Sequence, residues 1–280
     1  MLWFATLGLS IALPLLGALM LCVCLMRGYW VGVVLLVAVG VFYLGASYWP
    51  VLKRSVPEKP HGTQRVVFLN ALIQGPDRAA QSLALLRQNP DVIALVEADT
   101  AWVQRMGGIE FGDYPYRVLH KVGLREGRII YDDHIMLASR WPLERVGHDG
   151  TEGDGLALYK VMAPQAFHVF VIHPMAPLFA DAVPLRNQFL HELAAMVLPK
   201  DTLVVGDFNA VPWDPAMWPL WDNPHLNAYF SWLPTYRPDV PAVPIDHVLS
   251  AKGLDVKSIR RWYDGQSDHF GLVIDFKISP

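Results

Sequence analysis

The sequence predicts an α/β domain built from two stacked β-sheets with outer helices, preceded by two membrane-spanning helices. Three observations support this prediction. The first 52 residues contain two long runs without a charged side chain. The remainder contains short β-branched runs that end in polar residues, as buried strands often do. Because the predicted strands there outnumber the predicted helices, two stacked sheets fit better than one doubly wound sheet.

Residues 2–26 and 29–52 are the two charge-free runs, which are 25 and 24 residues long. A bilayer core about 30 Å thick is crossed by roughly 20 apolar helical residues, so each run can span it. A cleaved signal peptide should begin with positive side chains, and the first four residues carry none. A buried core hairpin is rarely so uniformly apolar. We therefore predict that residues 1–52 form a transmembrane helical hairpin.

Basic residues beside the two runs predict the orientation of this hairpin. Lys53, Arg54 and Lys59 follow the second run, whereas Arg27 alone lies between the runs. Flanks rich in Lys and Arg tend to stay in the cytoplasm. The count therefore favours, by a small margin, a C-terminal domain on the cytoplasmic side of the membrane.

Residues 53–64 are predicted to be a linker, because they contain Pro57, Pro60 and Gly62 and show no apolar periodicity. Residues 65–280 then form a single domain, which is long enough to bury a large core. We expect this domain to carry the function of the protein.

Charge and cysteine content exclude several classes of protein. The chain has a formal net charge of −3. From residue 60 onward acidic residues exceed basic ones by six, because four of the 23 basic residues but one of the 26 acidic residues precede that position. Sequence-independent binding of duplex DNA usually depends on a basic surface, so the composition disfavours it. Cys22 and Cys24 are the only cysteines, which excludes a disulfide scaffold and a cysteine-rich zinc site.

Four apolar runs in the domain end in residues that can bind a metal ion or a phosphate. These end residues are Asn70, Glu97, His173 and Asp207, after runs 66–69, 92–96, 167–172 and 203–206. Open α/β sheets build their sites at such strand ends. Further strands are predicted over residues 135–138, 156–162, 245–249 and 271–278. Helices are predicted over residues 77–88 and along an apolar stripe between Pro184 and Pro199.

The most specific motif is Asp207-Phe208-Asn209 at the end of a predicted strand. Alternation along the strand places the Asp207 carboxylate and the Asn209 amide on the same side of the chain. An ordinary junction between a strand and a turn is the alternative, because Asp and Asn favour turns.

Two triplets, residues 245–247 and 267–269, place a histidine directly after an aspartate. A carboxylate beside an imidazole can fix the ring's tautomer and keep an imidazolium close to a phosphate. Either triplet alone is also compatible with an exposed loop. Together with Asn70, Glu97 and His173 at strand ends, the triplets indicate one shared site.

These residues stand in motifs that resemble the endonuclease/exonuclease/phosphatase superfamily, which includes DNase I-like nucleases, neutral sphingomyelinases and inositol-polyphosphate 5-phosphatases. The motifs are FLNA with Asn70, PDVIALVEAD with Glu97, LASRWPL at 137–143, VIHP with His173, VVGDFNAVPW at 204–213, PIDHVL at 244–249 and GQSDHFGLVI at 265–274. They occur in the family's order over most of the chain. The likeness is strongest to membrane-anchored bacterial members, which implies a multi-pass protein of a bacterial inner membrane.

The resemblance implies a four-layer α/β/β/α sandwich of two mixed sheets with outer helices. It also implies a hydrolase of phosphoric ester bonds, of the nuclease, phosphodiesterase or phosphatase type, that depends on Mg²⁺ or Mn²⁺. Glu97, Asn70 and Asp268 match the metal-binding positions of the family. Their oxygen atoms suit a hard cation that keeps several water ligands.

The resemblance implies catalytic roles for five further residues. Asp207 matches the group that aligns or deprotonates the attacking water, and Asn209 helps to position it. His269 matches the histidine that stabilises the pentacovalent phosphorane, with Asp246 as its orienting partner. His173 matches a histidine on the scissile phosphate.

The sequence departs from the family pattern at two places, before the predicted strand 135–138 and directly before Glu97. Asp132-Asp133-His134 stands where the family usually has a small residue, and Val96 replaces a frequent glutamine before Glu97. The acidic cluster makes extra metal or substrate contacts, or is a solvated loop; both interpretations stay open at this point.

Residues 211–236 are rich in aromatic side chains and bear on the substrate. The rings can stack on bases, insert into the bilayer interface or cap the sheet as a satellite core. The expected substrate is a phosphate ester, either a lipid headgroup or a nucleic acid, and no obligate protein partner is expected. The hairpin favours the lipid, and the acidic balance disfavours the nucleic acid. A non-catalytic, membrane-tethered binding domain is the alternative function, and the complete set of polar site residues argues against it.

Overall fold

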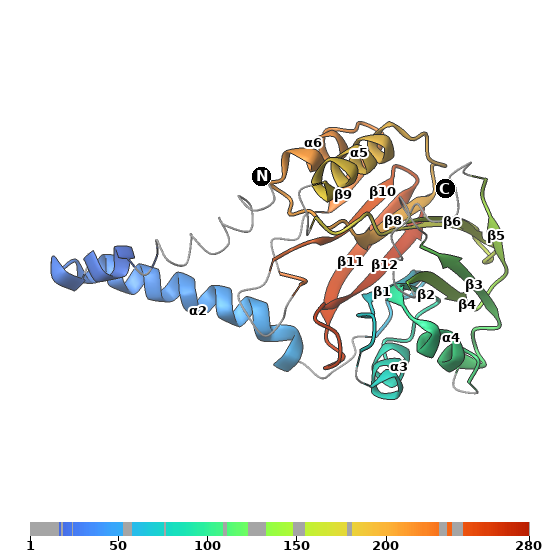
Figure 1. The fold of residues 1–280 in the computed structure, drawn as a ribbon, viewed down its shortest axis with the longest axis horizontal. Coiled ribbons are helices and arrows are strands. Elements are labelled where there is room, and N and C mark those ends of the chain that lie inside the picture. The colour runs from blue at the N-terminus through green and yellow to red at the C-terminus, as the bar shows by residue number, and fades with distance from the viewer. Residues whose placement is uncertain are drawn as a thin grey trace.

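The computed structural model describes residues 17, 19–23, 25–52, 58–75, 77–108, 111–122, 133–147, 155–177, 181–229, 234–236 and 243–279. Within these residues, two six-stranded sheets form the centre of the fold (Figure 1). The strand order of the first sheet is β11 (Leu254–Trp262), β12 (Gly271–Ile278), β1 (Gln64–Asn70), β2 (Val92–Ala98), β4 (His134–Ser139) and β3 (Tyr116–Lys121). The strand order of the second is β5 (Leu143–Arg145), β6 (Leu156–Val161), β7 (Phe167–Ile172), β8 (Thr202–Asp207), β10 (Asp246–Ala251) and β9 (Leu226–Tyr229).

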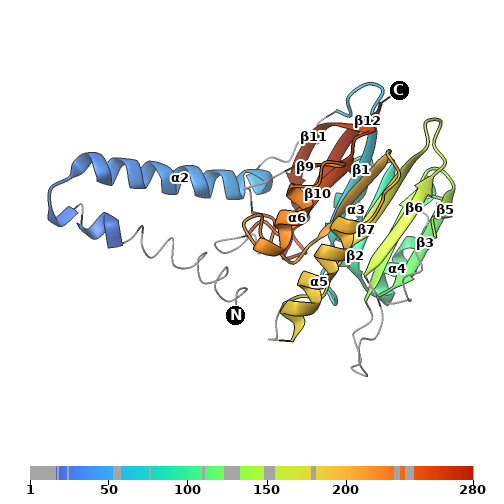
Figure 2. The same ribbon diagram turned by 90° about the horizontal axis from the view of Figure 1, so that it is seen from above.

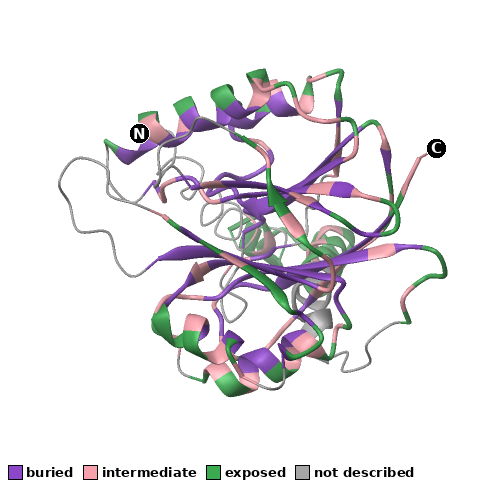
Figure 3. Cartoon of the chain, turned by 90° about the vertical axis from the view of Figure 1, so that its right-hand side faces the viewer, coloured by how far each residue is buried: buried purple, intermediate pink, exposed green. Residues whose placement is uncertain are grey.

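Helices cover the outer face of each sheet, which gives four layers (Figure 3). The first sheet carries α3 (Arg78–Leu86) and α4 (Thr100–Met106), and the second carries α5 (Ala182–Ala195), the 3₁₀ helix η2 (Pro215–Met217) and α6 (Trp218–Trp221). Both sheets combine parallel and antiparallel pairs. The prediction of two mixed, stacked sheets with outer helices is confirmed.

Alternation along the strands divides the apolar residues between three cores. On β1, Val66 and Phe68 enter the core between the two sheets, whereas Val67 and Leu69 pack under α3 and α4. On β8, Val205 enters the central core and Val204 packs under α5 and α6. This period of two follows from the opposite directions of successive side chains in a strand. It also decides which polar residues at the strand ends lie between the sheets.

Gly206 allows β7 and β8 to approach each other closely. A Cβ atom at this position would overlap the carbonyl oxygen of Ile172. The two strands are parallel, with Ile172 paired to Gly206. The glycine therefore brings the end of β7, which leads into His173, beside Asp207.

The N-terminal region includes α2 (Trp30–Leu52), which extends away from the sandwich (Figures 1 and 2). Large apolar side chains along its first half are exposed, among them Trp30, Val31 and Val39. No helix in the described part of the chain combines the length and apolar character needed to cross a bilayer. The structure thus gives no support to the predicted hairpin, whose first run lies largely outside the described residues, as do residues 53–57 of the predicted linker.

Several elements were not predicted from the sequence. The longest is β11, whose exposed face carries Asp255, Lys257 and other polar side chains while only its ends are fully buried. Its apolar content is too low for the pattern of a buried strand. It is an edge strand that pairs with β12 alone, so only one neighbour and one face constrain its composition.

Candidate active site

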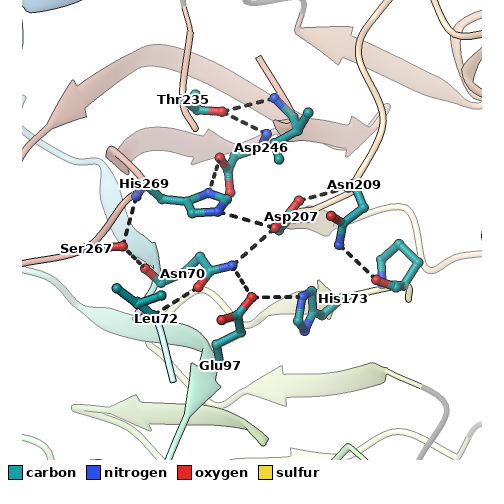
Figure 4. Close-up of polar contacts among 12 residues, drawn as sticks. Asn70, Leu72, Glu97, His173, Asp207, Asn209, Thr235, Asp246, Ser267 and His269 are labelled. Carbon is teal, nitrogen blue, oxygen red and sulfur yellow. Dashed lines mark hydrogen bonds and ion pairs between the residues drawn. The ribbon is translucent and has the colours of Figure 1, made fainter. Parts of the chain in front are cut away.

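Strand direction brings the polar strand ends to one edge of the sandwich. The pairs β1–β2 and β7–β8 are parallel, whereas β4, β10 and β12 run antiparallel to their neighbours β2, β8 and β1. The last residues of β1, β2, β7 and β8 therefore lie at the same edge as the first residues of β4, β10 and β12. The side chains gathered there are those of Asn70, Glu97, Asp133, His173, Asp207, Asn209, Asp246, Asp268 and His269 (Figure 4 draws most of them).

Alternation explains why Asp246 enters the site and its neighbour His247 does not. Val248 on the same strand lies in the central core, so Asp246 two residues earlier points between the sheets as well. His247 points to the opposite face, where its ring packs edge-on against Phe208 and Trp221 and its Nε2 donates to the carbonyl oxygen of Ala210. Burial lowers the pKa of His247 to about 4. It is a neutral histidine of the outer core.

Glu97 reaches the site because the strand that carries it is irregular. The register between β2 and β4 shifts between Leu95 and Ala98, and Glu97 has a φ of 52°. A bulge of this kind re-aims side chains. Strict alternation would have turned Glu97 toward the helices, where Leu95 and Ala98 pack. A left-handed backbone is costly for a residue with a Cβ, and such positions cluster at functional sites.

Asn70 connects two carboxylates of the site. Its Nδ2 donates to Glu97 Oε1 at 2.9 Å and to Asp207 Oδ2 at 3.1 Å. Its Oδ1 accepts from the backbone N–H of Leu72 at 3.1 Å, and Glu97 Oε2 lies 3.4 Å from the N–H of Ile73. One side chain thus links the first sheet to the second.

Asp246 and His269 form a buried carboxylate–imidazole pair. His269 Nδ1 lies 2.9 Å from Asp246 Oδ2, and His269 Nε2 lies 3.7 Å from Asp207 Oδ2. Burial alone would lower the pKa of His269. The negative charges of Asp246, Asp207 and Asp268 outweigh burial and raise this pKa to about 10. The ring is therefore an imidazolium at neutral pH, with one N–H held by Asp246 and the other directed at Asp207.

A short segment around Thr235 supports this pair. Thr235 Oγ1 accepts from the backbone N–H groups of Ile245 and Asp246, and its carbonyl oxygen accepts from Phe270 N–H. The ring of the next residue, Tyr236, lies 4.8 Å from the His269 ring, centroid to centroid. The segment therefore ties both members of the pair to one piece of backbone.

His173 lies between two carboxylates. Its Nε2 is 3.6 Å from Glu97 Oε1, and its Nδ1 is 3.6 Å from Asp133 Oδ2. Burial opposes the charged form, but Asp133, Glu97 and Asp207 raise the pKa of His173 to about 9. Asp133 reaches the site because Ile135 and Leu137 of the same strand face the central core, whereas His134 faces the other way and its Nδ1 contacts Ala98 O. Asp133 and His134 of the predicted cluster thus face opposite ways, and Asp132 lies outside the described residues.

Asp207 is the centre of the cluster. Burial and the charge of Asp246 raise its pKa to about 6, against the opposing effect of His269 and His173. Its Oδ1 accepts from the backbone N–H of Asn209 at 2.8 Å. A carboxylate with a pKa close to neutral can accept a proton from water during a reaction at physiological pH.

The donor set fits a hard divalent cation. Glu97, His173 and Asp207 offer ligand atoms that all lie within 4.8 Å of one another, as do Asp207, Asp246 and His269. Buried oxygen atoms of Asp133 and Asp246 have no hydrogen-bond partner among the described residues. Mg²⁺ and Mn²⁺ take carboxylate oxygens, which Glu97, Asp207 and Asp246 supply, whereas the protonated rings of His173 and His269 leave no lone pair for a cation.

The three predicted metal ligands are placed differently by the structure. Glu97 lies beside His173 and Asp207, where a cation could bind. Asn70, in contrast, directs its nitrogen, not its oxygen, at Glu97 and Asp207. Asp268 is half-buried, and burial together with the charge of Glu97 raises its pKa despite His269. A cation beside Glu97 and Asp268 would relieve this repulsion.

Sequence reasoning missed three residues that shape the site. Asp133 was noted only as part of an acidic cluster, and alternation with Ile135 and Leu137 was the signal that could have singled it out. Thr235 carried no signal within the aromatic segment. Ser267 donates to the carbonyl oxygen of Asn70 at 2.7 Å and accepts from His269 N–H, which holds the second triplet against β1.

Taken together, clustered carboxylates, a cation-compatible donor set and a buried imidazolium define a site for metal-assisted hydrolysis. Such a site can neutralise phosphate charge, position water and accept its proton without a covalent nucleophile. This is the chemistry of a phosphoesterase.

The sequence model of the Endonuclease/Exonuclease/phosphatase family matches residues 70–269, which include every site residue described above. The chain belongs to this family and is a hydrolase acting on phosphoric ester bonds. A search of curated protein sequences found no match.

Solved structures show the same fold. An endonuclease/exonuclease/phosphatase from Beutenbergia cavernae is 20% identical and covers 78% of this chain and 72% of its own, with a TM-score of 0.60. TDP2 from D. rerio, solved with a single-strand DNA product, is 17% identical and covers 77% and 99%, with a TM-score of 0.56. Sphingomyelinase C from Streptomyces griseocarneus is 17% identical and covers 76% and 99%, with a TM-score of 0.54. At these identities the likeness concerns the fold.

Proposed function

We propose that this protein is a membrane-anchored phosphodiesterase that hydrolyses its substrate by direct attack of water, with Asp207 as proton acceptor. A phosphomonoester is a less favoured substrate of the same chemistry. The observation that carries the proposal is the meeting of Asp207, whose pKa is about 6, with the protonated His269 at a distance of 3.7 Å. A group that can take a proton thus faces a group that can stabilise negative charge.

Glu97 and Asp268 would hold Mg²⁺ or Mn²⁺ in this proposal, and Asn70 would join them once its amide turns its oxygen toward the cation. The cation, when bound, supplies charge neutralisation at the phosphate and polarises a phosphoryl oxygen. The ligand atoms of Glu97, His173 and Asp207 lie within 4.8 Å of one another. A phosphate bound beside Glu97 would therefore also meet His173 and Asp207 from the second sheet.

The side chains of the protein supply the rest of the mechanism. Asp207 orients the attacking water and accepts its proton. His269 donates a hydrogen bond from Nε2 to the phosphoryl oxygens as negative charge builds up there, and Asp246 keeps its ring oriented through Nδ1. His173 binds a further oxygen of the scissile phosphate. Asn209 fixes the Asp207 carboxylate through its backbone N–H.

The membrane anchor is part of the proposal and is supported by composition. Residues 2–26 and 29–52 carry no charge, and the described apolar side chains in the first half of α2 are exposed. We propose a multi-pass protein of a bacterial inner membrane, with the catalytic domain on the cytoplasmic side as the distribution of Lys and Arg favours.

A phospholipid headgroup is the substrate class we favour, and a nucleic acid is the alternative. The anchor would keep the site close to headgroups, and the acidic balance of the domain disfavours binding of a polyanion. The aromatic side chains of residues 211–236 that the structure describes support neither substrate strongly. Trp221 and Tyr229 pack on the cores, and Trp218 alone among these three is largely exposed.

The test is phosphodiester hydrolysis by the full chain in detergent, with and without Mg²⁺ or Mn²⁺. The substrates are bis-p-nitrophenyl phosphate, plasmid DNA and phospholipid vesicles. Asp207→Ala and His269→Ala should each abolish metal-dependent turnover in a folded protein. Asp201→Ala is the matched control, because Asp201 lies next to the other end of β8 and contacts His168. Normal turnover in both site variants would refute the mechanism, and turnover of DNA alone would establish the alternative substrate.

A further inference from the structure

Arg186 on α5 is fully buried behind the site. Its Nη1 donates to the carbonyl oxygen of Asn209 at 2.8 Å. Its Nη2 donates to Asp214 Oδ2 at 2.6 Å, and Nε and Nη2 both donate to Asn187 Oδ1, at 3.0 and 2.6 Å. The guanidinium therefore joins the helix to the loop that follows Asp207.

Asn209 is the residue through which that loop is held. Its backbone N–H donates to Asp207 Oδ1 at 2.8 Å, and its side-chain Nδ2 donates to the carbonyl oxygen of Pro174 at 3.0 Å. Pro174 directly follows His173. Asn209 thus connects Asp207 on β8 with the loop that carries His173 after β7.

The backbone of Asn209 needs support from its surroundings. Its φ is 50°, in the left-handed region, which is unfavourable for a residue with a Cβ and persists where neighbouring contacts impose it. In this conformation the carbonyl oxygen accepts from Arg186. The N–H points to Asp207 on the site side of the chain (Figure 4), and the side chain donates to Pro174. The carbonyl and the N–H of Asn209 belong to successive peptide units joined at its Cα, so a change in the φ and ψ angles of Asn209 on loss of Arg186 would shift the hydrogen bond to Asp207.

A buried arginine is expensive unless its charge is paired. Asp214 supplies the countercharge, and its other oxygen accepts from Ala216 N–H. An apolar side chain would fill the same space without that cost. The planar fork, however, can hold a carboxylate with one arm and a carbonyl oxygen with the other.

We propose that Arg186 is a positioning residue that sets the orientation of the Asp207 carboxylate through the backbone of Asn209. The proposal rests on the proposed function of Asp207. Misplacement of a reacting group by about 1 Å can cost about 100-fold in rate. Arg186 therefore acts on turnover without touching substrate or metal.

The chain offers a matched control for this role. Arg65 is also buried and forms a two-point ion pair with Asp275, through Nε at 2.7 Å and Nη2 at 3.1 Å. It lies near the start of β1, at the end of the strand opposite to Asn70, and contacts no site residue among its described partners. Asp275 also accepts from Arg260 Nη2 at 3.0 Å, so the control removes at least as much buried ion pairing as the Arg186 variant, yet it should leave turnover unchanged.

The experiment compares the full chain with R186K, R186M/D214N and the control R65M/D275N. Removing both charges of a buried pair usually costs less stability than removing one, so the double variants are the ones expected to fold well. R186M/D214N should lower kcat by about 10- to 100-fold with KM unchanged. R186K should lose less, because lysine keeps the charge and one donor nitrogen but not the two-armed fork. The control should keep kcat within about twofold. A Tm measurement confirms that each variant is folded.

Native-state hydrogen exchange supplies a readout that does not need activity. In R186M/D214N the Asn209 amide should exchange at least about tenfold faster, while amides of β1 stay protected. If the unaltered protein shows no turnover, the proposed function fails and exchange alone decides the role of Arg186. Unchanged kcat and unchanged exchange in a folded Arg186 variant would overturn the proposal. Failure of both Arg186 variants to fold, with a folded control, would make Arg186 a stability residue and overturn it as well.

Discussion

His269 Nδ1 lies 2.9 Å from Asp246 Oδ2, and the other nitrogen of the same ring faces Asp207 at 3.7 Å. The residues come from the start of β10, the segment before β12 and the end of β8. Asp246 is bound on one side only, because its Oδ1 has no hydrogen-bond partner among the described residues. Among the described residues, His269 is therefore the hydrogen-bond partner of the Asp246 carboxylate.

Asp246→Asn tests this pair. The substitution keeps the shape of the side chain but removes the charge that sustains the imidazolium, so we expect kcat to fall by about 10²- to 10⁴-fold with little change in KM. The measurement is steady-state hydrolysis of bis-p-nitrophenyl phosphate at pH 7.5. Asp255→Asn on the exposed face of β11 serves as control. Equal rates for the two variants would show that His269 works without its carboxylate.

Asp133→Asn tests the second carboxylate–imidazole contact. Asp133 Oδ2 lies 3.6 Å from Nδ1 of His173 and its charge favours the protonated ring, so we expect its loss to lower kcat by about 10- to 100-fold. His134→Gln is the matched control, because that ring contacts Ala98 on the other face of β4. If the His134 variant loses as much activity as the Asp133 variant, the loss comes from disturbance of β4 and not from the contact between Asp133 and His173.

Glu97→Gln tests the metal site. The neutral amide keeps an oxygen but loses the charge that a divalent cation prefers, so the Mg²⁺ concentration at half-maximal rate should rise by more than about tenfold. Removal of metal with a chelator should stop turnover in the unaltered protein, and added Mg²⁺ or Mn²⁺ should restore it. Glu144→Gln on β5 controls for a general charge effect. An unchanged titration would place the cation away from Glu97.

His247 predicts a loss of stability in acid. Burial lowers its pKa to about 4, whereas the unfolded chain titrates near 6.5. The unfolded state therefore binds more protons between these values, so the contribution of the neutral ring is present above pH 6.5 and is lost as pH falls toward 4. Its size is on the order of 3 kcal/mol.

The measurement is urea denaturation at pH 7.5 and pH 5. His247→Gln keeps a donor for the carbonyl oxygen of Ala210 and removes the titrating ring. This variant should lose distinctly less stability between the two pH values than the unaltered protein. Identical losses would show that other groups cause the acid sensitivity.

Residues 58–280 are predicted to fold without the N-terminal region. The buried apolar clusters of the described structure draw all their members from residue 66 onward. The shortened chain should therefore be monodisperse without detergent, unfold cooperatively and retain phosphodiester hydrolysis. Aggregation that detergent reverses would mean that the N-terminal region packs against the domain, and the boundary at the linker would be wrong.

Local sequence accounts for much of the fold and for the members of the site. The runs before Asn70 and Asp207 are apolar throughout because each face of the strand meets an apolar core. The strands and their polar ends could therefore be identified without the structure, but not which residues face which core. The roles assigned to these residues stay predictions. β11 was missed because an edge strand with polar faces lacks the apolar pattern of a buried one.

By itself, the sequence determined that an α/β domain with two sheets carries Asn70, Glu97, His173, Asp207, Asp246 and His269 near strand ends, because each buried strand is a short apolar run bounded by polar residues. Only the tertiary structure decided that Asp133 faces His173, that a bulge turns Glu97 inward and that Arg186 holds Asn209. These contacts depend on strand order and on the facing of two sheets, which join residues far apart in the chain. No local pattern encodes such pairings, since each partner is compatible with many surroundings until the whole core is packed.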